Sequence, residues 1–234
     1  MVKSLDFHPM LASADSRAEP CLNAEVFSQR GTVVGSGTVK DDRSSNAAAD
    51  GAMDRYASGD VEAFSVLYDL LAPRLYGFLL RQTRNPARAE DLVQQTLLQM
   101  HCARGRFIRG APVTPWAFAI ARRLLIDDVR RNKFEGPRSS DPGAPDPVDT
   151  ALATDLPADE RVHSNELARM IRHALDGLPE PQRVAFELVK QEGLTHAEAA
   201  GVLGTTVMAV KLRAHRTYEA LRAALGPVFD TRDV

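Results

Sequence analysis

The sequence predicts an all-α protein made of two small helical domains joined by a flexible linker, and three observations favour this fold class. Aromatic residues make up 6% of the 234 residues, with a single Trp, which is unusual for a β-sandwich or barrel. Several segments repeat apolar residues at the helical spacing i, i+3, i+4 and i+7. Between two groups of such segments, residues 135–158 hold five prolines and few large apolar residues, which is typical of an extended linker.

The first predicted domain spans residues 56–134 and contains three helices. We expect the first to begin at Asp60 as N-cap and to be kinked or interrupted at Pro73. Its inward face carries Phe64, Leu67, Tyr68, Leu71, Leu75, Phe78 and Leu79. Asn85 followed by Pro86 predicts the second start, because Asn caps well and Pro suits the first helical position. Thr114-Pro115 predicts the third.

The segments outside these domains carry no motif. Residues 1–55 are rich in Ala, Ser, Gly and Asp and show no periodicity, so we expect either a disordered leader or a wrongly assigned start codon. Residues 135–165 form the predicted flexible linker. Residues 227–234 form a C-terminal tail after the second domain, which spans 166–226.

The second domain carries the sharpest local signal. Thr195 and Glu198 fit a capping box, in which each side chain satisfies a free N–H of the other residue at a helix start. Gly204 supplies a turn, Ala200 is small where two helices would cross, and Val210 would be buried beneath them. This spacing predicts a helix-turn-helix.

The second helix of that motif is predicted to enter the major groove of duplex DNA. Its candidate contacts are Thr205, Thr206, Met208, Lys211, Leu212 and His215 for the bases, with Arg213 and Arg216 for phosphates. The alternative is an ordinary helical hairpin with solvated basic side chains. The glycine, the capping box and an excess of basic residues over 205–222 together favour DNA binding.

A second basic segment lies in the first domain. The formal net charge of the chain is -2, but residues 104–133 hold eight Arg or Lys against two Asp. On charge alone, a polyanion site and a solvated Arg-rich helix face remain equally open. Basic side chains beside an aromatic ring suit melted DNA, although a lone Trp is more often a core residue. The candidates are Arg104, Arg106, Arg109, Trp116, Arg122, Arg123, Arg130 and Arg131.

No catalytic, cofactor or metal site is predicted. The sequence has no Gly-rich phosphate loop and no HExxH, and its two cysteines lack zinc spacing. The pair Asp127-Asp128 lies among arginines, so we expect salt bridges there. No run approaches the roughly 18 uninterrupted apolar residues of a membrane-spanning helix. We therefore expect a cytoplasmic protein that is not an enzyme, has no small-molecule substrate and does not insert into a membrane.

The order of motifs resembles the extracytoplasmic-function (ECF) class of bacterial sigma-70 family factors. The motifs are DVEAF at 60–64, AEDLVQQTL at 89–97, WAFAIAR at 116–122, ID at 126–127, LP at 178–179, EGLT at 192–195, EAA at 198–200, LG at 203–204 and VKLR at 210–213. The resemblance covers sigma region 2 at about 56–134 and region 4 at 166–226. It implies an RNA polymerase sigma factor that binds the core enzyme and directs promoter-specific initiation of transcription.

The resemblance also implies partners and site residues. The predicted outward face of residues 89–100 is acidic and amide-rich, and the family's core-binding helix maps onto it at Glu90, Asp91, Gln94, Gln95 and Leu98. The polymerase β′ and β subunits are therefore expected partners, together with promoter DNA and an anti-sigma factor. The basic segment, with Asp127, would read the minus-10 element, and the helix-turn-helix the minus-35 element. The alternatives are a sigma-like decoy that binds an anti-sigma protein and an unrelated helix-turn-helix regulator.

Overall fold

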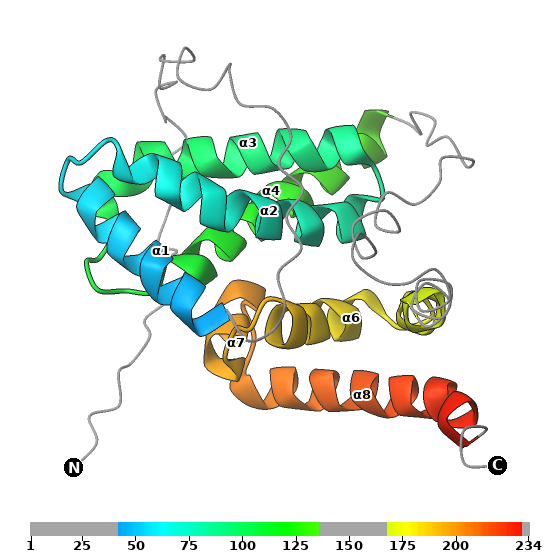
Figure 1. The fold of residues 1–234 in the computed structure, drawn as a ribbon. Coiled ribbons are helices and arrows are strands. Elements are labelled where there is room, and N and C mark those ends of the chain that lie inside the picture. Colours follow the sequence, from blue (N-terminus) through cyan, green and yellow to red (C-terminus); the bar gives the residue numbers. More distant parts are fainter. Residues whose placement is uncertain (1–41, 136–167, 231–234) are drawn as a thin grey trace, which may run out of the picture. The chain divides into compact units, whose positions relative to one another are not determined.

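The structure, a computed structural model, describes residues 42–135 and 168–230. Its helices are α1 (Asp42–Ala57), α2 (Ala63–Thr83), α3 (Pro86–Ala103), the 3₁₀ turn η2 (Arg104–Arg106), α4 (Val113–Glu135), α6 (Glu180–Phe186), the π-helical segment η4 (Glu187–Gln191), α7 (His196–Leu203) and α8 (Val207–Asp230) (Figure 1). Residues 168–176 are also helical. These described ranges contain no strand, so the all-α prediction is confirmed. The predicted leader up to residue 41 and the linker from residue 136 to 165 lie outside them.

Helix α1 corrects the prediction that residues up to 55 are a leader without structure. Its sixteen residues form a helix that buries Ala49, Ala52, Met53 and Tyr56. These positions follow the spacing i, i+3, i+4 and i+7, so α1 does have an inward stripe. Two of its four members are alanines, and the surrounding Ser, Asp and Asn hid the pattern.

Helix α2 is the central helix of the first group and packs on α1, α3 and α4. It begins at Ala63 after Glu62, so the predicted N-cap at Asp60 is wrong; the Asp60 carboxylate lies 3.9 Å from the Arg55 guanidinium instead. Of the two expectations at Pro73, a kink or an interruption, the interruption is wrong, because α2 runs unbroken through it. The buried neighbours Leu71 and Leu75 hold the helix on both sides of the proline, and this packing offsets the missing N–H.

By length and composition, α2 could cross a membrane, and it is the one described helix for which this holds. Asp69 and Arg74 interrupt its apolar residues. The side chains that its neighbours bury are Ala63, Leu67, Leu71, Ala72, Leu75, Phe78, Leu79 and Leu80. Its apolar character is therefore explained by its place in the helical core.

The starts of α3 and α4 follow the sequence closely. Asn85 is the N-cap of α3, and its side chain accepts a hydrogen bond from Arg88 N, as predicted. Helix α4 begins at Val113, one residue before the expected Thr114. The buried stripe of α3 consists of Ala89, Leu92, Val93, Thr96, Leu97 and Met100. This stripe turns the opposite face of α3 away from the core.

In the second group, α7 and α8 form the predicted helix-turn-helix. The capping box of Thr195 and Glu198 is present, and Gly204 adopts the left-handed conformation at φ +60°. The Thr206 hydroxyl accepts from Ala209 N at 3.2 Å, so Thr206 caps α8. Helix α8 runs to Asp230, beyond the predicted tail boundary at 227.

All described residues belong to one compact unit, and ion pairs join α2 to the segment around η4. Arg81 Nη2 donates to Glu192 Oε1 at 2.7 Å, and Gln82 Nε2 donates to Glu187 Oε2 at 2.6 Å. Arg74 Nη2 donates to the Glu192 carbonyl oxygen at 2.6 Å. Both glutamates are buried. Burial raises the pKa of each, and the nearby arginines only partly offset that rise.

Candidate nucleic-acid and polymerase interfaces

The outer face of α3 presents all five residues predicted to bind the polymerase. Leu98 is 39% exposed, and the four polar side chains beside it, Glu90, Asp91, Gln94 and Gln95, are exposed as well. The buried stripe on the opposite side of α3 fixes this orientation. The result is an acidic, amide-bearing surface with one apolar residue at its end, which suits docking against a basic partner.

The loop between α3 and α4 carries the first basic candidates. Arg104 and Arg106 lie in η2 and Arg109 in the following loop, and all three are exposed. The Trp116 ring is half-buried and packs against Phe107, with ring centroids 5.1 Å apart. The sequence left open whether Trp116 is a core residue or an exposed ring on which bases could stack. In the structure Trp116 is intermediate between these two.

Contacts from α1 and α3 fix the start of this loop. Arg104 Nη1 donates to the His101 carbonyl at 3.0 Å, and its guanidinium lies 5.7 Å from the centre of the Tyr56 ring. The Tyr56 hydroxyl is hydrogen-bonded to His101 Nδ1. Burial lowers the pKa of His101, and the charge of Arg104 lowers it further. The Arg104 guanidinium is thus held against His101 and Tyr56, although Arg104 as a whole is exposed.

Helix α4 divides its basic residues between two environments. Arg123, Arg130 and Arg131 are exposed, whereas Arg122 is largely covered and its Nη1 has no hydrogen-bond partner. Burial lowers the pKa of Arg122, with Glu180 raising it and Arg213 lowering it. Arg122 is therefore less accessible than the exposed candidates of the basic segment.

The two aspartates of α4 form the salt bridges that the sequence predicted. Asp127 Oδ1 lies 3.9 Å from Arg130 Nη1 on the next turn of the helix. Asp128 accepts a hydrogen bond from the Arg88 guanidinium of α3. These pairs place negative charge between exposed arginines and cross-link α4 to the start of α3.

Sequence reasoning missed three polar residues of α1 that hold the loop before α4. Gly110 N donates to Asp54 Oδ1 at 3.0 Å, and Val113 N donates to Asp50 Oδ1 at 2.7 Å. The Thr114 hydroxyl donates to Asn46 Oδ1 at 3.1 Å. Burial raises the pKa of Asp50, and the Val113 N–H partly offsets this. A period of four at 46, 50 and 54 was the available signal, but it becomes visible only once residues 42–57 are known to be helical.

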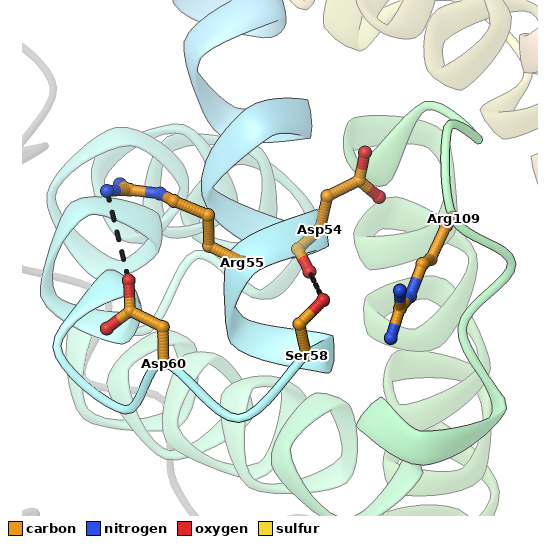
Figure 2. Close-up of a pocket in the computed structure, with 5 residues that line it drawn as sticks. All are labelled: Asp54, Arg55, Ser58, Asp60 and Arg109. Carbon is orange, nitrogen blue, oxygen red and sulfur yellow. Dashed lines mark hydrogen bonds and ion pairs between the residues drawn. The ribbon is translucent and has the colours of Figure 1, made fainter.

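An open hollow lies beside this loop, lined by Asp54, Arg55, Ser58, Asp60 and Arg109. Figure 2 shows Arg109 on the loop and Asp54 on the adjacent face of α1. The hollow is therefore bordered by one basic side chain from the loop and by both charge types from α1. Among the described residues, no group of three His, Cys, Asp or Glu side chains could hold a metal ion.

The exposed face of α8 carries most residues predicted to contact duplex DNA. Met208 is 72% and Leu212 47% exposed, while Ala200 and Val210 are buried where α7 and α8 meet. Thr205 and Arg213 are half-buried, so they are less accessible than the rest. The other exposed candidates are Thr206, Lys211, His215 and Arg216.

The chain matches two family models, described as Sigma-70 region 2 over residues 67–135 and Sigma-70, region 4 over residues 168–221. It is 37% identical over 174 residues to the RNA polymerase sigma factor CarQ of Myxococcus xanthus, covering 74% of this chain and 95% of that protein. It is 37% identical over 168 residues to the ECF RNA polymerase sigma factor SigF of Caulobacter vibrioides, covering 71% and 88%.

Two solved structures have a similar fold. One is the sigma factor RpoE in complex with the anti-sigma factor NepR from Bartonella quintana, with a TM-score of 0.52, 23% identity and coverage of 70% of this chain and 96% of that one. The other is CnrH in complex with the cytosolic domain of CnrY, with a TM-score of 0.55, 24% identity and coverage of 77% and 98%. At these identities the likeness shows the fold alone.

Proposed function

The chain belongs to the ECF class of sigma-70 family transcription initiation factors, and we propose that it binds core RNA polymerase and directs it to specific promoters. The observation that carries this is the presence, on one chain and in family order, of an acidic face on α3, a basic loop before α4 and a helix-turn-helix at α7 and α8. A repressor built on a helix-turn-helix needs neither of the first two.

We assign polymerase binding to the α3 face of Glu90, Asp91, Gln94, Gln95 and Leu98. Its carboxylates and amides suit a basic surface of the β′ subunit, and Leu98 supplies an apolar contact at one end. The minus-10 element would be melted and read by the loop with Arg104, Arg106 and Arg109, and by Trp116, Arg123, Arg130 and Arg131 of α4. Arg122 and Asp127 would contribute less, because Arg122 is largely covered and Asp127 is paired with Arg130.

The minus-35 element would be read as duplex by α8. Exposed Thr206, Met208, Lys211 and Leu212 would approach base edges near the helix start, where a recognition helix contacts bases. Further along α8, His215 would also approach base edges, whereas Arg216 would reach the backbone. Thr205 and Arg213 would support this surface from its half-buried side.

The protein would act through binding alone, in the cytoplasm of a bacterial cell, while the polymerase performs the chemistry. RpoE is seen bound to the anti-sigma factor NepR, and CnrH to the cytosolic domain of CnrY. An anti-sigma factor is the corresponding partner for this chain.

Run-off transcription with core polymerase and this chain tests the proposal. A transcript that begins at a defined promoter and requires both components is the expected result. A decoy or an unrelated regulator would give no such transcript.

A variant pair separates the role of α8 from general charge. Replacing exposed Lys211 and Arg216 by Ala should weaken minus-35 duplex binding and reduce the salt slope by about one for each phosphate that is no longer neutralised. Arg222→Ala, an exposed arginine further along α8, is the matched control and should leave binding unchanged. Unaltered binding by the double variant would mean that α8 does not bind the minus-35 element.

A further inference from the structure

We propose that helix α1, which precedes the segment matched by the region 2 family model, positions the promoter-reading loop by holding its backbone with Asp54 and Asp50. The inference rests on the proposed function in one respect, namely that the loop before α4 reads melted DNA. It adds two positioning residues that touch no DNA themselves.

The contacts join segments that are far apart in the chain. Asp54 accepts from Gly110 N at 3.0 Å and Asp50 accepts from Val113 N at 2.7 Å, across 56 and 63 positions. The two aspartates lie one helical turn apart, so they share a face of α1. Helix α1 packs against α4, and the segment that enters α4 passes beside α1 (Figure 1).

The Val113 N–H needs a partner because Val113 is the first residue of α4. The first N–H groups of a helix have no acceptor within the helix. Val113 is fully buried, so water cannot take the place of the carboxylate, and a buried unpaired N–H is destabilising. Asp50 therefore caps α4 from a different helix, and its negative charge is favourable at that end of the helix dipole.

The Gly110 contact restrains the exposed tip of the loop. Gly110 has φ +77°, and the loop closes a turn by a hydrogen bond from Ala111 N to the Ile108 carbonyl at 3.0 Å. Ile108 is 67% exposed, and Arg109 beside it is exposed too. A glycine-containing loop samples many conformations when free. Holding Gly110 in place reduces the ordering that the loop must undergo when it binds DNA.

The negative charge of Asp50 and Asp54 allows a positioning role to be distinguished from a purely electrostatic one. Carboxylates beside a DNA-binding surface repel phosphates, so as charges alone Asp50 and Asp54 would weaken binding. Removing the charge by Asn or by Ala would then strengthen binding equally. If the carboxylates position the loop, Asn retains the Oδ1 acceptor and the hydrogen bond to the loop, whereas Ala has no acceptor there.

The test uses the full chain with core polymerase on a promoter already shown to give run-off transcription. The variants are Asp54→Ala, Asp54→Asn, Asp50→Ala and Asp50→Asn. Glu62→Ala is the matched control, because Glu62 is an exposed carboxylate immediately before α2 whose side chain makes no capping hydrogen bond. Permanganate reactivity measures promoter melting, and a premelted promoter with single-base changes in the minus-10 element measures discrimination.

We expect both Ala variants to lose roughly tenfold in melting and in discrimination, with the Asn variants within about twofold of the wild type. Polymerase affinity and minus-35 duplex binding should stay unchanged, which a general loss of structure would not allow. Ala variants with wild-type discrimination, or Asn and Ala variants that change together, would overturn the proposal.

If an Ala variant fails to fold, the double variant Asp50→Asn with Asp54→Asn decides the question. Wild-type discrimination by the double variant supports positioning, and a loss of discrimination refutes it. A wild-type chain that yields no promoter-dependent transcript counts against the proposed function instead.

Discussion

The two turns that we propose to face DNA differ in where their restraints come from. The turn between α7 and α8 is held by hydrogen bonds between residues at most five positions apart, from Thr205 N to the Ala200 carbonyl oxygen and from Ala209 N to Thr206 Oγ1. The loop between α3 and α4 is held by Asp50 and Asp54 of α1, 63 and 56 positions away. The α7–α8 turn is therefore restrained by its own neighbouring residues, whereas the α3–α4 loop is restrained by residues of a distant helix.

The two turns should therefore respond differently to substitutions elsewhere in the chain. The α7–α8 turn depends on residues within its own motif, so its geometry should survive changes elsewhere. The α3–α4 loop depends on a packed neighbour, so anything that loosens α1 loosens the loop too. Distant contacts also include Glu192, which follows η4 but finds its charged partners on α2.

The largest effect is expected from Glu192→Ala, which tests the distant contacts. This side chain is 6% exposed, and its loss leaves the largely buried guanidinium groups of Arg74 and Arg81 without their shared carboxylate. The free energy of unfolding should fall by about 2–3 kcal/mol, as measured by urea denaturation. Glu192→Gln is the control, because it keeps an acceptor oxygen. A variant as stable as the wild type would mean that the contact with α2 does not persist in solution.

The same residue predicts a pH dependence. Burial raises the pKa of Glu192, with Arg81 and Arg74 offsetting part of the rise. The folded chain therefore binds this proton more tightly than the unfolded chain does. The resulting stabilisation is complete below the ordinary pKa of 4.5 and is lost as the pH rises through the higher folded value. As the pH falls from 7 to 4.5, the wild type should gain stability relative to Glu192→Gln. Parallel curves of unfolding free energy against pH for the two proteins would refute this.

The restraints that are near in sequence were predictable and the distant ones were not. Asn85, the Thr195 box and Gly204 each act within a few residues, so their chemistry could be read directly from the order of residues. Asp50 and Asp54 lie in a segment expected to be a leader, and their acceptor role exists only because the fold brings α1 beside α4. The continuation of α2 through Pro73 could not be read from the sequence for the same reason, since core packing rather than local preference decides whether α2 continues.

The next largest effect concerns the turn that carries its own restraints. Gly204→Val should destabilise the second group by about 2 kcal/mol, because a β-branched residue is strained in the left-handed conformation. Nothing lies within 4 Å of the position where a Cβ would be, so the effect comes from the backbone and not from a clash. Gly204→Asn should be tolerated much better, since Asn enters this conformation readily. Equal stability of the two variants, measured by thermal unfolding, would contradict this explanation.

A smaller effect is expected at the capping box. Thr195→Ala removes the acceptor for Glu198 N and should lower stability by about 1 kcal/mol. Thr195→Ser keeps the hydroxyl and is the control. Both variants should leave discrimination within the minus-10 element unchanged on a premelted promoter, because Asp50 and Asp54 still hold the α3–α4 loop. A change there would show that the two turns are coupled.

The smallest effect, and the only gain, is expected from Gly51→Ala in α1. Gly51 is exposed in the middle of the helix, and an added Cβ would have no neighbour within 4 Å. Alanine should therefore stabilise α1 by about 0.5–1 kcal/mol through lower backbone entropy in the unfolded chain. Gly51→Pro should break α1 and release the loop, so promoter melting should fall while minus-35 binding persists. If neither substitution changes stability or melting, α1 contributes nothing to the folded protein. The α3–α4 loop then has no distant restraint, and it no longer differs in this respect from the α7–α8 turn.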